Sequence, residues 1–274
     1  MSATEKSKTC AILSLDRIRV AAADFAAAAA SMEKLLGHAA EVGEEDATLR
    51  LSNMSLEIVP SEQGTEGLCG LAFSISNAQA MHRTCERRAL HPSAPVAFAE
   101  SDTQGGLIEG RHFSLSVEAT HGVPVSLIEY TAKPAHALQH ATKGAITGLD
   151  HVVVRTTHPN RAAALYGARL GLDMRLDRTE PKWGTRLMFF RCGDLVVEVV
   201  HNLNEPASDT PDRLWGLSWR APDIEAAHAR LSSSGFSVSE IRTGRKPGTR
   251  VFTVKDGTLG VPTLVIQPPA RDDN

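Results

Sequence analysis

The chain has 274 residues, enough for two medium-sized domains that each bury a core of their own. Its formal net charge is −3, so it lacks the overall positive field with which proteins hold nucleic acids or anionic membranes. We therefore expect neither a nucleic acid nor a membrane as its partner.

No segment of the chain has the features of a membrane span or a disulfide framework. The alanine-rich run at 21–30 is interrupted by Asp24 and flanked by charged residues, which indicates an amphipathic helix. No C-x-x-C pair occurs, which favours reduced thiols over disulfides or a structural zinc site. The expected location is the cytoplasm. The four scattered cysteines are Cys10, Cys69, Cys85 and Cys192.

The first half contains two units in which a strand is followed by a helix and further strands. One begins with a strand at 15–20, and the other begins at 70–73 and ends in a strand after Gly122-Val123-Pro124. Strands are indicated by apolar residues that alternate with polar ones, and helices by one apolar face. The helices of this half are predicted at 22–36 and 78–90.

The second half repeats this order, with helices predicted at 160–170 and 224–234. Leu15–Val20 matches Leu149–Val154, and the match continues without a gap through the next helix. Glu57 and Glu198 then occupy the middle of corresponding strands. We therefore predict an N-terminal domain at 1–130, a linker at 131–148 that contains proline and glycine, a C-terminal domain at 149–269 and a tail at 270–274.

These repeated units resemble the vicinal oxygen chelate superfamily, which includes glyoxalases, bleomycin resistance proteins and extradiol dioxygenases. The similarity covers nearly the whole chain and is strongest in Leu149–Val154, Gly171-Leu172, Gly193–Glu198 and Ala221–Ala227. The resemblance implies an α+β fold of two tandem modules. Each module would consist of two βαβββ units that form a curved mixed sheet, or cup, with helices outside.

The resemblance also implies a divalent metal in the cup, bound by side chains from the first and fourth strands of each unit. In the C-terminal module these positions hold His151 and Glu198, which suit Fe, Zn, Mn or Ni, but also Gly216 and Leu264, which cannot bind a metal. His112 of the N-terminal module is a candidate third ligand, because units of different modules face each other in glyoxalase-type assemblies. The alternative is a cup without metal.

In the N-terminal module, Arg17 takes the place of the first ligand. We expect it to form a bidentate ion pair with Glu57, which would make this module a scaffold. The remaining ligand positions of this module hold Gly70 and Ser126.

The best candidate catalytic residues are therefore Glu198 and His151. Without a metal, Glu198 would serve as a general base if the apolar cup raises its pKa, with His151 as its proton partner. The basic turn 244–248 would either recognise an anion or form a solvated hairpin tip. The candidate substrate-binding residues are Trp183, Arg186, Met188, Phe190 and Arg250.

Three functions follow from these expectations. The first is a glyoxalase-like enzyme that acts on a small carbonyl, enol or aromatic molecule, anionic or neutral, by proton transfer, isomerisation or lyase chemistry, with or without a metal. The second is a protein that sequesters a small molecule without turnover, as bleomycin resistance proteins do. The third is an extradiol-type dioxygenase with a degenerate ligand set. A homodimer is compatible with each.

Overall fold

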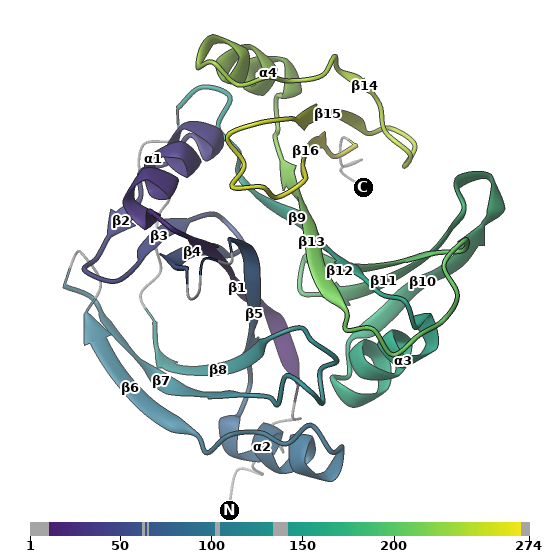
Figure 1. Cartoon of the computed structure of the whole chain (residues 1–274). Helices are drawn as coiled ribbons and strands as arrows, with labels where there is room; N and C mark the ends of the chain where they lie inside the picture. Colours follow the sequence, from purple (N-terminus) through teal and green to yellow (C-terminus); the bar gives the residue numbers. More distant parts are fainter. Residues whose placement is uncertain (1–10, 62–63, 65, 102–104, 134–141, 270–274) are drawn as a thin grey trace, which may run out of the picture.

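The computed structural model describes residues 11–61, 64, 66–101, 105–133 and 142–269. It contains two mixed sheets of eight strands each, one in each half of the chain (Figure 1). Part of the predicted linker at 131–148 and the whole tail at 270–274 lie outside the described residues.

The first sheet has the order β2-β3-β4-β1-β5-β8-β7-β6. β1 lies in its middle, parallel to β4 and antiparallel to β5. Its strands are β1 (Ile12–Ala22), β2 (Glu41–Val42), β3 (Ala47–Arg50), β4 (Ser55–Pro60), β5 (Gly67–Ile75), β6 (Val96–Ser101), β7 (Leu107–Ser114) and β8 (Val125–Ala132).

The second sheet repeats this arrangement in the order β10-β11-β12-β9-β13-β16-β15-β14. β9 takes the place of β1, with β12 parallel and β13 antiparallel to it. Its strands are β9 (Gly148–Arg155), β10 (Asp173–Glu180), β11 (Thr185–Cys192), β12 (Leu195–Asn202), β13 (Arg213–Arg220), β14 (Arg242–Thr243), β15 (Arg250–Val254) and β16 (Thr263–Gln267).

The helices lie on the outside of the two sheets (Figure 1). The described α-helices begin at side-chain caps, where Asp24, Asn77, His158 and Asp223 each accept a hydrogen bond from a backbone N–H of the first turn. No helix among the described residues is long and apolar enough to cross a membrane. The helices are α1 (Phe25–Leu36), α2 (Ala78–Arg87), α3 (Pro159–Ala163), which continues as a π-helix over Ala164–Arg169, and α4 (Ile224–Ser233).

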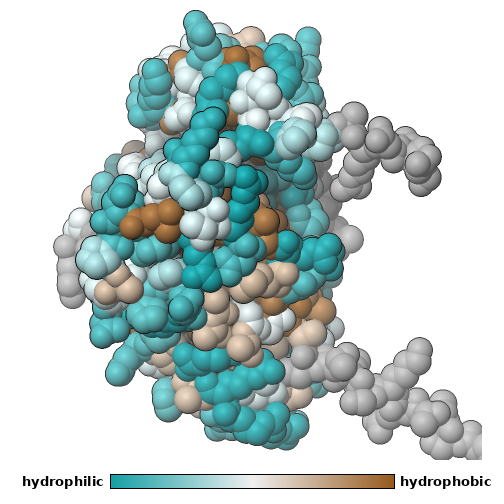
Figure 2. All heavy atoms as spheres, turned by 90° about the vertical axis from the view of Figure 1, so that its right-hand side faces the viewer, coloured by the Kyte–Doolittle hydropathy of each residue, from teal (hydrophilic) through white to brown (hydrophobic). Residues whose placement is uncertain are grey.

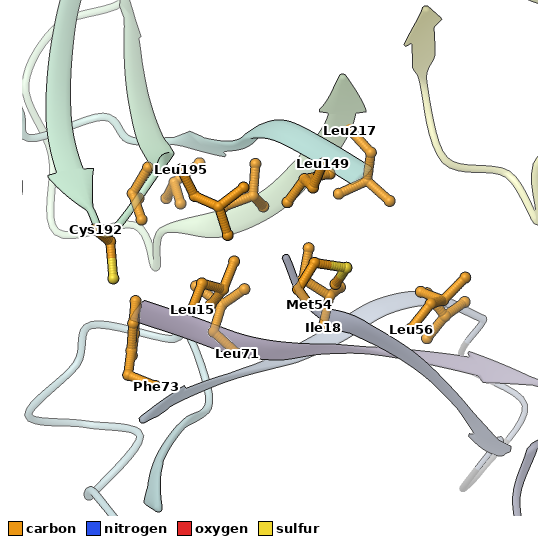
Figure 3. Packing of buried hydrophobic residues seen from close by; sticks show 14 of the residues in the cluster. Leu15, Ile18, Met54, Leu56, Leu71, Phe73, Leu149, Cys192, Leu195 and Leu217 are labelled. Atoms are coloured by element: carbon orange, nitrogen blue, oxygen red, sulfur yellow. The ribbon is translucent and has the colours of Figure 1, made fainter. Parts of the chain in front are cut away.

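The two modules share one continuous hydrophobic core. Side chains of β1 and β5, among them Leu15 and Phe73, face side chains of the second sheet, among them Leu149 and Leu195 (Figure 3). All four are fully buried. Because neighbouring side chains of a strand alternate between faces, the concave faces of the two sheets point away from this interface. The structure confirms the predicted tandem α+β fold, and it places the two cups back to back.

Candidate functional site

His151 and Glu198 lie on neighbouring strands at the centre of the second sheet. β9 and β12 run parallel, with Val196 opposite His151, so that both side chains project from the same face. The Nε2 atom of His151 lies 3.2 Å from the Oε2 atom of Glu198. The side chains are 19% and 14% exposed, so the pair is largely buried but can still be reached from the cup.

Asp150 also faces the cup, although strict alternation would place it on the opposite side from His151. A β-bulge in β9 is the reason: His151 pairs with Ser218 and Leu149 pairs with Trp219, so Asp150 has no partner on β13. The Oδ2 atom of Asp150 lies 2.9 Å from Nδ1 of His151. The imidazole is therefore held between two carboxylates.

Arg220 completes this row of charges. Its Nε donates a hydrogen bond to Oδ1 of Asp150 at 3.1 Å, and its Nη1 donates one to Oδ2 of Asp194 at 2.7 Å. The guanidinium neutralises Asp150 and fixes the carboxylate on the side that faces His151. Asp150 therefore serves to orient the imidazole, as a buried carboxylate does beside a catalytic histidine.

Burial and charge shift the pKa of each member of this row. Burial works against ionisation of Asp150, but hydrogen bonds from His151 and Arg220 outweigh it and lower its pKa. Burial also opposes a charged His151, but its hydrogen bond to Asp150 and the charge of Glu198 raise its pKa. Burial raises the pKa of Glu198, although the charges of His151 and Arg245 act against this shift. Raised pKa values in both His151 and Glu198 suit proton transfer near neutral pH.

The walls of this cup include residues that the sequence alone does not single out. Phe189 of β11 lies directly opposite Glu198, and Ser218 of β13 lies directly opposite His151. Opposed residues of antiparallel strands share one face of the sheet. The two-residue turn Gly193-Asp194 would have revealed Phe189, because such a turn sets the pairing register of the two strands it joins.

Met188 and Phe190 do not line the cup, contrary to the prediction. Both are fully buried on the opposite face of β11, and the ring of Phe190 lies 5.6 Å from that of Tyr166 in the π-helix. The prediction correctly grouped the two residues on one face. It assigned that face to the cup, but the π-helix covers the face, so both residues belong to the hydrophobic core.

Arg186 and Arg250 are also turned away from the cup. Arg186 donates hydrogen bonds to both carboxylate oxygens of Asp177, at 2.8 and 2.7 Å, and to Asn160 of α3. Arg250 forms an ion pair with Glu225 in the first turn of α4. Both arginines therefore join the sheet to its outer helices, and the prediction that they bind substrate is corrected.

Trp183 lies at the rim of the cup, in a 3₁₀ turn (Pro181–Trp183) between β10 and β11. Its side chain is 39% exposed, and the guanidinium carbon of Arg245 lies 4.4 Å from the centre of its ring. Of the predicted substrate-binding residues, Trp183 alone remains a candidate for contact with substrate.

His112 lies in the other cup. Its ring lies at a tilt against that of Phe98, 5.9 Å between centroids, and the Phe98 ring also contacts Tyr130 on the concave face of the first sheet. Because the two cups open in opposite directions, His112 does not join His151 and Glu198. The expectation of a third ligand from the N-terminal module is therefore corrected.

The residues around His151 do not fit a catalytic metal centre. Such centres usually have three protein ligands, whereas only His151 Nε2 and Glu198 Oε2 face each other here. The remaining ligand positions hold Gly216 and Leu264. Within the described ranges, no group of three or more His, Cys, Asp or Glu side chains is arranged to hold a metal ion.

This donor set predicts the outcome of a metal titration. We expect Mn²⁺ and Zn²⁺ to bind the wild-type chain no more tightly than they bind the variant His151→Ala, as measured by isothermal titration calorimetry. A tight site of one metal per chain that disappears in His151→Ala would contradict this expectation.

The corresponding position of the first cup has a different network. Only Nη1 of Arg17 approaches Glu57, at 3.8 Å from its Oε2 atom, so the predicted bidentate pair does not form. Instead, Glu57 forms its close ion pair with Arg19, whose Nε lies 3.0 Å from Oε2 of Glu57. The Nε atom of Arg17 lies 3.1 Å from Oδ2 of Asp16. Tyr130 donates a hydrogen bond to Asp16 at 2.8 Å. This cup keeps the aspartate beside its first position, but an arginine replaces the titratable imidazole.

Comparison with known proteins agrees with this architecture. Residues 150–253 match the sequence model of the Glyoxalase/Bleomycin resistance protein/Dioxygenase superfamily. No curated protein sequence matches the chain.

Several solved structures share the fold of the whole chain. A halotolerant catechol dioxygenase has 13% identity and a TM-score of 0.68, with 96% of this chain and 89% of that chain covered. A Mn(II)-bound glyoxalase from Novosphingobium aromaticivorans has 13% identity and a TM-score of 0.68, with 94% and 83% covered. Homoprotocatechuate 2,3-dioxygenase from Arthrobacter globiformis has 14% identity and a TM-score of 0.68, with 96% and 83% covered. At these identities the likeness establishes the fold.

Proposed function

We propose a function from the premise that the second module of this chain belongs to the vicinal oxygen chelate superfamily of glyoxalases, bleomycin resistance proteins and dioxygenases. In our proposal, the second cup binds a small carbonyl compound and moves a proton to and from the carbon next to the carbonyl group. The reaction is then an isomerisation, or a lyase reaction that begins with the same proton abstraction.

The observation that carries this proposal is the row formed by Asp150, His151 and Glu198. Glu198 is buried enough to have a raised pKa, and its oxygen lies 3.2 Å from the imidazole. Asp150 holds Nδ1 of His151, which leaves Nε2 directed toward Glu198 and the cup. The site therefore offers a carboxylate that accepts a proton beside an imidazolium that donates one.

These groups account for both proton movements of an enolisation. Glu198 takes the carbon-bound proton, and the C–H bonding pair becomes the C=C bond of the enol. The carbonyl π pair moves to oxygen, which receives a proton from Nε2 of His151. Reversal at the same carbon or at its neighbour returns both protons and gives the epimer or the isomer. Phe189 and Val153 provide apolar walls that keep Glu198 desolvated.

Sequestration without turnover is the second candidate. It is favoured by Gly216 and Leu264, which replace two of the metal ligands expected from the family resemblance. An extradiol dioxygenase is less well supported, because His151 and Glu198 supply only two of the three protein ligands that a catalytic metal centre usually has.

Solvent exchange distinguishes the two candidates. The wild-type chain is incubated in D₂O with phenylpyruvate, acetoacetate and dihydroxyacetone, and loss of the proton next to the carbonyl is followed by ¹H NMR. We expect at least one probe to exchange about 100-fold faster than in buffer alone, the usual scale of general acid–base catalysis. Probes whose lines broaden without faster exchange would favour sequestration, and no acceleration with any of the three would contradict the proposed enzyme.

A further inference from the structure

Two turns from opposite edges of the second sheet meet at the mouth of its cup. One is the turn with Trp183, between β10 and β11, and the other is the turn with Arg245, between β14 and β15. β10 and β14 are the two outermost strands of this sheet, with six strands between them. Figure 1 shows these two ends curving toward each other across the open side of the sheet. Their contact therefore forms a bridge over the cup.

The bridge is a cation–π contact. The guanidinium carbon of Arg245 lies 4.4 Å from the centre of the Trp183 ring, and Trp183 remains 39% exposed. A guanidinium that contacts a ring in this way can still direct its N–H donors, which lie in its own plane, toward a planar anionic group. The geometry thus leaves hydrogen-bond donors at the mouth of the cup.

Arg245 has no acidic partner within the described part of the chain, unlike the other arginine near Trp183 and Arg186 on β11. Arg178, which also lies near Trp183, forms an ion pair with Glu180. Arg186 is paired with Asp177. Lys182 and Lys246, in the same two turns, add positive charge without an ion pair among the described residues. Figure 2 views the molecule from the right-hand side of Figure 1, and the surface seen there is mostly hydrophilic with smaller hydrophobic regions.

The charge of Arg245 also reaches the interior of the cup. It acts to lower the pKa of Glu198, against the effect of burial. A ligand that extends from Glu198 toward the mouth would therefore pass from a buried carboxylate to an unpaired cation. This polarity suits a molecule with a reactive carbonyl at one end and a negative charge at the other.

We propose that the substrate is an organic anion whose carboxylate or phosphate group is held by Arg245 on the face of Trp183, while its carbonyl end lies at Glu198. This inference rests on the proposed function for the role of Glu198, and it extends that function by naming the substrate class. An anion at the mouth satisfies the free donors of Arg245. A neutral analogue would leave them without an acceptor.

The test measures binding without turnover. Trp215 is the other exposed tryptophan and Trp219 is buried, so a Trp215→Phe background leaves Trp183 as the exposed fluorescent reporter. Benzoate, phenyl phosphate and neutral benzamide are titrated into this protein. We expect the anion that matches the site to bind at least about tenfold more tightly than benzamide, the scale of one charge-assisted hydrogen bond. Comparison of benzoate with phenyl phosphate identifies which anionic group is preferred.

Variants locate the effect. Arg245→Gln should abolish the preference for the anion, and Arg87→Gln, which removes an exposed charge from α2 of the other module, should leave it unchanged. Equal binding of all three probes, or a preference that survives Arg245→Gln, would overturn the inference. Glu198→Gln should keep the anion preference, so loss of exchange in that variant tests the proposed function separately.

Discussion

Replacement of Glu198 by glutamine is expected to slow solvent exchange of the carbonyl probe by about 100- to 10,000-fold, the range usually contributed by general acid–base catalysis. The amide has nearly the same shape as the carboxylate but cannot accept the proton from carbon. Its contact with His151 at 3.2 Å can still be made, so the cup should retain its structure. The exchange rate is measured by ¹H NMR in D₂O.

The first module provides a matched control. Glu57 occupies the corresponding strand position and also contacts cations, but it has arginines as partners instead of an imidazole. Glu57→Gln should therefore leave the exchange rate unchanged. If both variants lost activity equally, the effect would be structural, and an unchanged rate in Glu198→Gln would rule out its role as the base.

The pH dependence of exchange follows from the same two groups. Glu198 must be ionised, so the rate should rise as pH passes its pKa, which burial raises above that of an ordinary carboxyl. His151 must be protonated, so the rate should fall as pH passes its pKa. Burial opposes the rise of that pKa, but Asp150 and Glu198 outweigh it. Asp150→Asn removes the negative charge beside Nδ1, and the alkaline limb should then shift to lower pH.

Truncation of Phe73 to alanine should have the largest effect on stability, a loss of about 3–5 kcal/mol in the free energy of unfolding. The ring is fully buried and faces the second module near Cys192 (Figure 3). Its removal leaves a cavity where the two cores meet. Urea unfolding followed by circular dichroism gives the difference.

Exposed Leu13 on the same sheet is the control, since it is 53% exposed and Leu13→Ala should change stability by no more than about 0.5 kcal/mol. Because the core is continuous across both modules, Phe73→Ala should shift a single transition. Two transitions, of which only one moves, would show that the modules unfold independently.

Much of the architecture could be predicted because it depends on local patterns. Apolar alternation and helix caps indicated the units, and the match of Leu15–Val20 to Leu149–Val154 revealed their repetition. The same repetition selected His151 and Glu198, and the parallel pairing of β9 with β12 brings them together. The alternation and the caps depend on spacing within one strand or helix, and the repetition shows which strands of the two halves correspond.

The errors concern which face of a strand becomes the cup. The spacing of Met188 and Phe190 is the same whether that face meets a helix or a ligand, and here it meets the π-helix. Arg186 was assigned to the wrong side for the same reason. A period of two groups the residues of a strand, but the layer that covers each face is set by distant parts of the chain.

The sequence by itself determined the tandem α+β fold and the pair of residues at the centre of the second sheet. The tertiary structure alone decided that Asp150 turns toward His151, that His112 belongs to the opposite cup, and that Arg245 meets Trp183 across the mouth. The orientation of Asp150 depends on a β-bulge that no residue type marks in the sequence. The position of His112 depends on how the two sheets pack against each other, and the contact of Arg245 with Trp183 depends on how the twisted second sheet curves round. Such contacts join residues far apart in the chain, and no local pattern encodes them.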